Sequence, residues 1–209
     1  AVIFQEEGKP IQKVTQNELL NLVNQIANGL VELGLKQGDK IAIDMPMTLE
    51  AVAVYLAGIK AGMPIVTIAD SFTPNEIAVR LKITQPKVIF TQDVLQRTGK
   101  EIPLFSKVVE ANAPKAIVLK VSEEMIFLRK EDLYWNTFLS SNTEFTTVIQ
   151  NPDDAITILF SSGTTGEPKA IPWTHTTPIK GASDGYYHQD IQQSDVVCWP
   201  TNLGWMMGP

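Results

Sequence analysis

Apolar residues near the start of the chain recur every three or four positions, which is the spacing of one face of an α-helix. Thr15 and Glu18 precede most of this run in the pattern of a capping box, and Gly34 follows it. The sequence therefore predicts a helix from residue 15 to residue 33. Its apolar face consists of Leu19, Leu22, Val23, Ile26, Leu30 and Leu33.

Further along, short apolar runs alternate with helical patterns. The apolar runs predict strands at 40–45, 65–69, 87–91, 116–121, 155–160 and 170–174. The helical patterns predict helices at 48–61, 73–83, 93–100, 105–112, 131–139 and 177–187, the last with Thr177 as its cap and Pro178 as its first residue. This alternation predicts an α/β fold in which helices flank a mostly parallel sheet.

One stretch breaks the alternation. Residues 140–154 are rich in Ser, Thr, Asn and Asp and carry few large apolar side chains, which is typical of a connection. We place a boundary near Gln150, so that residues 1–150 form a first α/β subdomain and residues 151–209 begin a second one.

Composition narrows the range of partners. The 209 residues carry a net charge of -6 without a run of Lys or Arg, which argues against nucleic acid or an anionic membrane as the partner. The apolar runs are far shorter than the roughly 20 residues that span a bilayer. The single cysteine, Cys198, cannot form an internal disulfide and is expected to be a buried structural thiol. We therefore expect small-molecule partners and a cytoplasmic location.

The candidate chemistry lies in the segment that follows the strand at 155–160. It reads SSGTTGEPK, from Ser161 to Lys169. Its glycines allow successive N–H groups to point into one concavity, its four hydroxyls add donors and Lys169 adds a positive charge, which together describe a phosphate cradle. The spacing differs from that of a P-loop, because Pro168 precedes the lysine and Ala170 follows it. A solvated turn remains the alternative.

The same segment closely resembles the phosphate-binding signature of the adenylate-forming superfamily, which includes acyl-CoA synthetases, luciferases and peptide-synthetase adenylation domains. Residues 56–62, 72–77 and 88–90 resemble other landmarks of that superfamily in the same order. The resemblance covers essentially the whole chain. It implies the partial N-terminal, AMP-binding domain of the acyl-CoA synthetase-like fold.

Residues 199–208, WPTNLGWMMG, are similar to the Gly-Trp segment of acetyl-CoA-synthetase-like members and of plant-type acyl-activating enzymes. This similarity favours acyl-CoA formation: ATP and a carboxylate give an acyl-adenylate and pyrophosphate, and the acyl group then passes to coenzyme A. A luciferase-like or peptide-synthetase role shares the same loop and stays open. A non-catalytic module that binds a nucleotide or phosphate is the alternative from another class.

The resemblance assigns roles to the loop residues. Those implied to hold the β and γ phosphates of ATP are Ser161, Ser162, Gly163, Thr164, Thr165, Gly166 and Lys169. Of these, Lys169, Thr164 and Thr165 are implied to act in catalysis, and either threonine is a candidate for positioning Mg²⁺ through the phosphates. The superfamily usually has glycine where Ala170 stands. No set of side chains has the spacing of a dedicated protein metal site.

The resemblance also suggests substrate-binding residues. Trp205, Met206 and Met207 align with the segment that lines the acyl pocket, with core packing as the alternative. His175 stands where a histidine or aromatic often occurs, and a structural histidine is an equal alternative, whereas His188 is expected on a helix surface. The superfamily's later motifs have no counterpart here, so we expect the first region of a larger enzyme, without full turnover by itself. The sequence does not indicate an oligomeric state.

Overall fold

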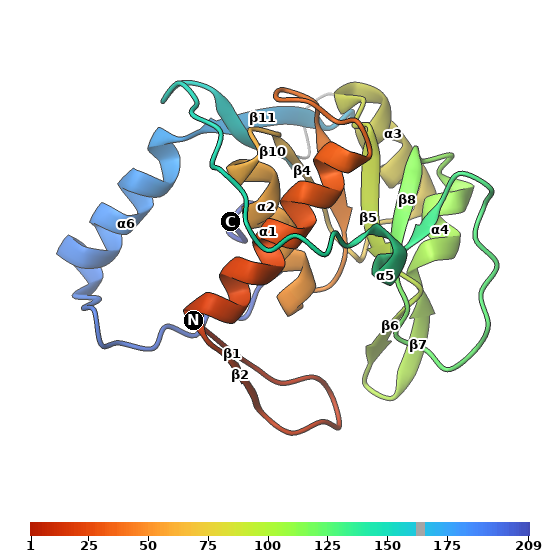
Figure 1. Cartoon of the computed structure of the whole chain (residues 1–209), viewed down its shortest axis with the longest axis horizontal. Helices are drawn as coiled ribbons and strands as arrows, with labels where there is room; N and C mark the ends of the chain where they lie inside the picture. Colours follow the sequence, from red (N-terminus) through yellow and green to blue (C-terminus); the bar gives the residue numbers. More distant parts are fainter. Residues whose placement is uncertain (162–165) are drawn as a thin grey trace.

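A computed structural model describes residues 1–161 and 166–209 of the chain (Figure 1). Its centre is a sheet of seven strands. All neighbouring strands are parallel except β10 and β11, which form an antiparallel pair. In spatial order the strands are β11 (Lys169–Thr174), β10 (Ala155–Ser161), β4 (Ile65–Ile68), β3 (Ile41–Asp44), β5 (Val88–Gln92), β8 (Lys115–Leu119) and β9 (Leu133–Tyr134).

Helices cover both faces of this sheet, which confirms the α/β architecture. The helices are α1 (Gln16–Glu32), α2 (Leu49–Lys60), α3 (Pro74–Thr84), α4 (Leu104–Glu110), α5 (Trp135–Phe138) and α6 (Thr176–Gln189). The capping boxes that start α1 and α3 are both present, with Thr15 paired to Glu18 and Thr73 to Glu76. A further two-stranded hairpin, β1 (Val2–Phe4) and β2 (Gln12–Val14), precedes α1.

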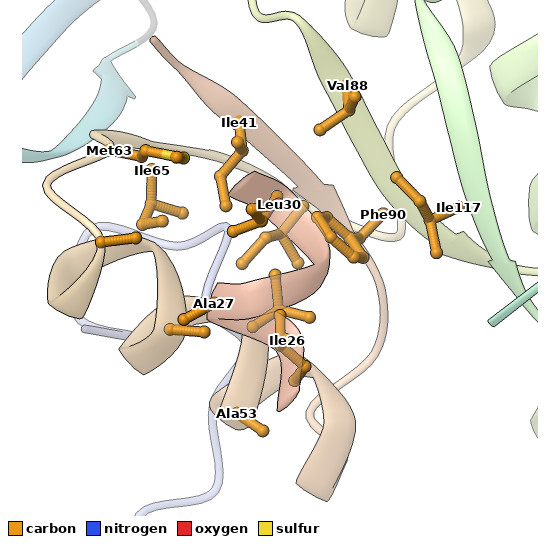
Figure 2. Packing of buried hydrophobic residues seen from close by; sticks show 14 of the residues in the cluster. Ile26, Ala27, Leu30, Ile41, Ala53, Met63, Ile65, Val88, Phe90 and Ile117 are labelled. Atoms are coloured by element: carbon orange, nitrogen blue, oxygen red, sulfur yellow. The ribbon is translucent and has the colours of Figure 1, made fainter. Parts of the chain in front are cut away.

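The side chains of each strand alternate between two apolar layers, as the pleat requires. On one face Ile41, Ile65 and Phe90 pack against α1 and α2, and Figure 2 shows them with Ile26 and Leu30 of α1. The other layer contains Ala42, Val66, Ile68, Ile89, Ala116 and Val118, together with apolar residues of α3 and α4. The central strands β3, β4 and β5 are therefore buried on both faces.

The helix predicted at 93–100 is wrong. The chain forms a hairpin there, with β6 (Val94–Arg97) antiparallel to β7 (Lys100–Pro103). Thr98 and Gly99, its two turn residues, both have positive φ, of 51° and 73°, which suits a two-residue hairpin turn. Glu7 accepts hydrogen bonds from the backbone N–H groups of both turn residues. A contact from distant sequence thus stabilises the turn.

Two other helix predictions need correction. Leu133 and Tyr134 pair with β8 as the edge strand β9, so the helix expected at 131–139 shrinks to the four residues of α5. The last helix begins at Thr176 with His175 in the capping position, so Pro178 lies in the first turn rather than at the first position. The connection at 140–154 has no helix or strand, as predicted. The subdomain boundary at Gln150 stays a prediction.

Cys198 is exposed, which corrects the expectation of a buried thiol. The neighbouring Val196, Val197 and Trp199 are exposed as well. These residues belong to an irregular segment that runs from α6 back to the sheet, and apolar neighbours in sequence do not bury a side chain unless an element covers them. His188 lies on the surface of α6, as expected.

α6 stands apart from the sheet (Figure 1). The structure describes all 14 of its residues, and none of them is buried. Helices of this length depend on tertiary packing for stability in water. We therefore expect the amides of α6 to exchange much faster than those of α1 when the 209-residue chain is measured by hydrogen exchange. Equal protection of the two helices would contradict this prediction.

Candidate functional site

The loop predicted to bind phosphate begins and ends at the carboxyl edge of the sheet. β10 runs parallel to β4, so Ser161 at its end lies on the same edge as the ends of β3 and β4. Lys169 opens β11 and is paired directly with Ser161. Ligands of α/β sheets bind outside the carboxyl ends of the strands, so this is the edge where a ligand is expected.

The structure describes part of this loop. Gly166 has a φ of +88°, a conformation that side-chain-bearing residues rarely adopt, and Lys169 is exposed. Gly166 therefore has the kind of backbone conformation for which the sequence pattern predicted a glycine in this loop. Four of the residues named above, Ser162, Gly163, Thr164 and Thr165, lie outside the described residues.

Arg80 supports the strand that leads into the loop. It extends from α3, with its guanidinium 3.9 Å from the ring centre of Phe72 and 5.3 Å from that of Phe160. Phe160 directly precedes Ser161. Arg80 is 8% exposed, and burial lowers the pKa of its guanidinium. This stacked cation fixes Phe160 through its aromatic face, one residue before the phosphate loop.

The Gly-Trp segment lies at the same edge. The Nδ2 of Asn202 donates to the carbonyl of Met45, just beyond β3, at 3.1 Å. A Cβ placed on Gly204 would lie 2.2 Å from the backbone nitrogen of Ala69, so only glycine allows this approach to the end of β4. Leu203 is buried in the core. The first residues of the segment are therefore fixed against β3 and β4.

The next three residues project from this anchor. Trp205 is 53% exposed and Met207 67% exposed, while Met206 is partly buried. The Nε1 of Trp199 donates to the carbonyl of Met207 at 2.8 Å and holds the backbone of the segment. Neither Trp205 nor Met207 packs into the core of the described chain, and a role of these side chains in substrate binding stays a prediction.

A group of charged residues that the sequence analysis did not single out also lies at this edge. Asp44 ends β3 and Asp70 follows β4, and both are buried. Lys107 of α4 donates to the carbonyl of Asp70 at 2.9 Å. Neither oxygen of Asp44 has a hydrogen-bond partner among the described residues. Burial, opposed by Lys107 and reinforced by Asp70, raises the pKa of Asp44 to about 8.

The sequence did carry a signal for Asp44 and Asp70, because an aspartate stands at or just beyond the end of each of two neighbouring parallel strands. His175, in contrast, lies at the opposite edge, since Thr174 at the end of β11 pairs with Ala155 at the start of β10. His175 is six residues beyond Lys169 along β11, which separates the two by about 20 Å, given ~3.3 Å per residue. His175 lines a cavity there with Leu56 and Val148.

The loop ends and the Gly-Trp segment thus share one edge, and His175 does not. Among the described residues, no three His, Cys, Asp or Glu side chains are grouped as metal ligands. Within residues 1–161 and 166–209, none of the helices has the length and apolar character needed to span a bilayer.

Comparison with known proteins connects this edge to a family. A family model described as AMP-binding enzyme matches residues 1–209. The chain is 50% identical to hexanoyl-CoA synthase of Cannabis sativa, over 100% of the chain and 30% of that enzyme. It is also 50% identical to probable acyl-activating enzyme 17, peroxisomal, of Arabidopsis thaliana, over 99% of the chain and 30% of that protein.

A solved structure extends the comparison. Acetoacetyl-CoA synthetase from Streptomyces lividans superimposes with a TM-score of 0.90 at 27% identity, covering 98% of this chain and 32% of that one. The predicted acyl-CoA synthetase-like fold is therefore confirmed. The chain spans about 30% of the length of the curated relatives named above.

Proposed function

Because the chain belongs to the AMP-binding enzyme family, we propose that it carries the phosphate-binding and acyl-selecting parts of an ATP-dependent acyl-CoA synthetase. The observation that supports this most is the position of two segments at one edge of the sheet. The ends of the loop, Ser161 and Lys169, lie at the same carboxyl edge as Asn202–Gly208. Phosphate and acyl group of one reaction would meet there.

In the proposed reaction a carboxylate oxygen attacks the α-phosphorus of ATP, and the bond to the β-phosphate breaks. Pyrophosphate leaves, and the thiol of coenzyme A later attacks the acyl carbonyl, releasing AMP and a proton. Negative charge gathers on the leaving pyrophosphate, so donors fixed around it stabilise the transition state. Lys169 supplies the charge, and Ser161, Ser162, Thr164 and Thr165 supply hydroxyls, with Gly163 and Gly166 giving the backbone its freedom.

The donor set at the loop fits an ion held mainly by ATP itself. Hydroxyl oxygens beside an ammonium group do not form a carboxylate cage, whereas Mg²⁺ commonly keeps its waters and binds substrate phosphates with one or two protein ligands. Thr164 or Thr165 would be such a ligand. When bound, the ion would neutralise phosphate charge, while Lys169 and the loop N–H groups orient the polyphosphate.

The carboxylate is proposed to contact Trp205, Met206 and Met207. Flexible methionine side chains adapt to more than one shape, so we do not expect acetate to be the sole substrate. The relatives include enzymes named for hexanoyl-CoA and acetyl-CoA, which supports a range of short and medium acids. His175 is a weaker candidate for substrate contact because of its place at the opposite edge. The cytoplasmic location stays a prediction, since two relatives are named as peroxisomal.

The test is exchange of radiolabelled pyrophosphate into ATP by the whole protein that contains these residues. Lys169→Ala is expected to lower carboxylate-dependent exchange by about 100-fold, the usual effect of removing one transition-state contact. Lys36→Ala is the matched control, because Lys36 is exposed between α1 and β3, at the amino end of the sheet. It should retain full exchange.

The alternative is a module that binds a nucleotide or phosphate without chemistry. ATP binding by the folded protein, combined with no exchange for any carboxylate from acetate to octanoate, would favour that alternative. Equal exchange by Lys169→Ala and wild type would remove the assignment of Lys169 while leaving the family membership intact.

A further inference from the structure

Asp70 connects three separate parts of the carboxyl edge. It follows β4 and is 4% exposed. Its Oδ2 accepts a hydrogen bond from Nη2 of Arg97, in the β6–β7 hairpin, at 3.0 Å, and one from Nδ2 of Asn202 at 3.4 Å. Its carbonyl accepts from Lys107 of α4. One strand end therefore holds a hairpin, a helix and the Gly-Trp segment together.

Asn202 connects Asp70 to the backbone of the Gly-Trp segment. Its Nδ2 faces both Asp70 and the carbonyl of Met45, while its Oδ1 accepts from the N–H of Gly204 at 2.7 Å. The carbonyl of Asn202 in turn accepts from the N–H of Trp205 at 3.1 Å. The orientation of one buried amide thus sets where the backbone turns before the side chains of Trp205, Met206 and Met207.

We infer that Asp70 is a positioning residue for acyl-group selection. It would act through Asn202 on Met206 and Met207, which are proposed to form one wall of the acyl pocket. This inference rests on the proposed function. A pocket discriminates acids by the space left for each methylene, which is worth roughly 10- to 200-fold in kcat/KM. A shift of the turn at Gly204 moves the wall, so the loss of the Asp70 contact alters which acid fits best.

The contact chemistry determines which substitutions keep the wall in place. Asp70→Asn retains a side-chain oxygen that can accept from Asn202, with nearly the same volume. Asp70→Ala removes the acceptor and leaves the buried amide of Asn202 with one partner fewer. Asn202→Ala removes the same contact from the other side, together with the contacts to Met45 and Gly204. Arg97 is half-exposed, so its ion pair with Asp70 contributes less than the buried contact does.

The experiment measures pyrophosphate exchange by the whole protein with acetate, butyrate, hexanoate and octanoate. The readout is the ratio of kcat/KM between hexanoate and acetate. Asp70→Ala and Asn202→Ala are expected to change this ratio in the same direction by at least about fivefold, while the KM for ATP stays within about twofold. Asp70→Asn should remain close to wild type. Asp154→Ala, which removes an exposed turn contact to Asn151, is the matched control and should leave the ratio unchanged.

The outcomes separate this inference from the function on which it rests. A wild-type protein without exchange would overturn the proposed function, and the inference with it. Wild-type exchange combined with an unchanged acid preference in Asp70→Ala, whatever its overall rate, would overturn the inference alone. If Asp70→Ala does not fold, Asp70→Leu, which keeps the branched shape of aspartate without an acceptor for Asn202, decides the question at the same position.

Discussion

Asp44→Asn is expected to make the chain more stable than wild type at neutral pH, by an amount that grows as the pH rises. Burial raises the pKa of Asp44 from 3.8 to about 8, so the folded chain keeps a proton that the unfolded chain releases above pH 3.8. The stability linked to this proton is complete below 3.8 and is lost as the pH rises through 8. Asparagine does not titrate and avoids that loss.

The measurement is urea unfolding of both proteins between pH 5 and pH 7. The free energy of unfolding of Asp44→Asn, minus that of wild type, should increase by about 1.4 kcal/mol per pH unit. A difference that does not change with pH would show that Asp44 is ionised in the folded chain.

Asp132→Asn is the matched control. Asp132 is also a buried aspartate, but its oxygens accept hydrogen bonds from the N–H of Ala116 and from the guanidinium of Arg129. Asparagine would turn an N–H group toward these donors. The variant is therefore expected to be less stable than wild type at pH 7, in contrast to Asp44→Asn. The contrast tests whether the lack of hydrogen-bond donors, rather than burial alone, makes an ionised Asp44 destabilising.

The parts of the fold that were predictable from the sequence are those that local chemistry determines. The capping residues Thr15 and Thr73 fixed the starts of α1 and α3, and apolar runs located the parallel strands. The hairpin at 94–103 was missed because its turn depends on Glu7, about 90 residues away in the sequence. Burial of Cys198 was predicted wrongly because it was inferred from apolar neighbours in the sequence. A side chain is buried only where another helix or strand packs over it.

The candidate site also contains some features that local sequence determines and others that depend on contacts between distant residues. The loop from Ser161 to Lys169 was recognisable from residue types and order, and its place at the sheet edge follows from the parallel pairing of β10. The sequence places a polar residue, Asp44 or Asp70, at the end of each of two strands. It did not show that these residues lie near Asn202, because only the sheet topology brings residues so distant in sequence together. His175 is close to the loop in sequence, but an intervening strand carries it to the other edge.

Asp93→Ala is expected to destabilise the chain strongly. The carboxylate of Asp93 is 3% exposed and lies where β5 passes into the β6–β7 hairpin. It accepts from the N–H groups of Val94, Val121 and Ser122 at 2.8, 2.8 and 3.0 Å, and from the Ser122 hydroxyl at 2.7 Å. Alanine leaves these donors without that acceptor. Because each unpaired buried donor costs about 1–3 kcal/mol, we expect the free energy of unfolding to fall by about 4 kcal/mol.

Urea unfolding at pH 7 measures this loss, and Asp39→Ala serves as its control. Asp39 accepts from the N–H of Lys36 in an exposed turn, so its removal should cost less than about 1 kcal/mol. Hydrogen exchange then locates the effect. Fast exchange at Val121 and Ser122, with the amides of α1 still protected, would show that Asp93 fastens the hairpin junction to the sheet. A free energy of unfolding equal to that of wild type would show that water replaces the carboxylate without cost, and that the hairpin is held by Glu7 and its own strand pairing instead.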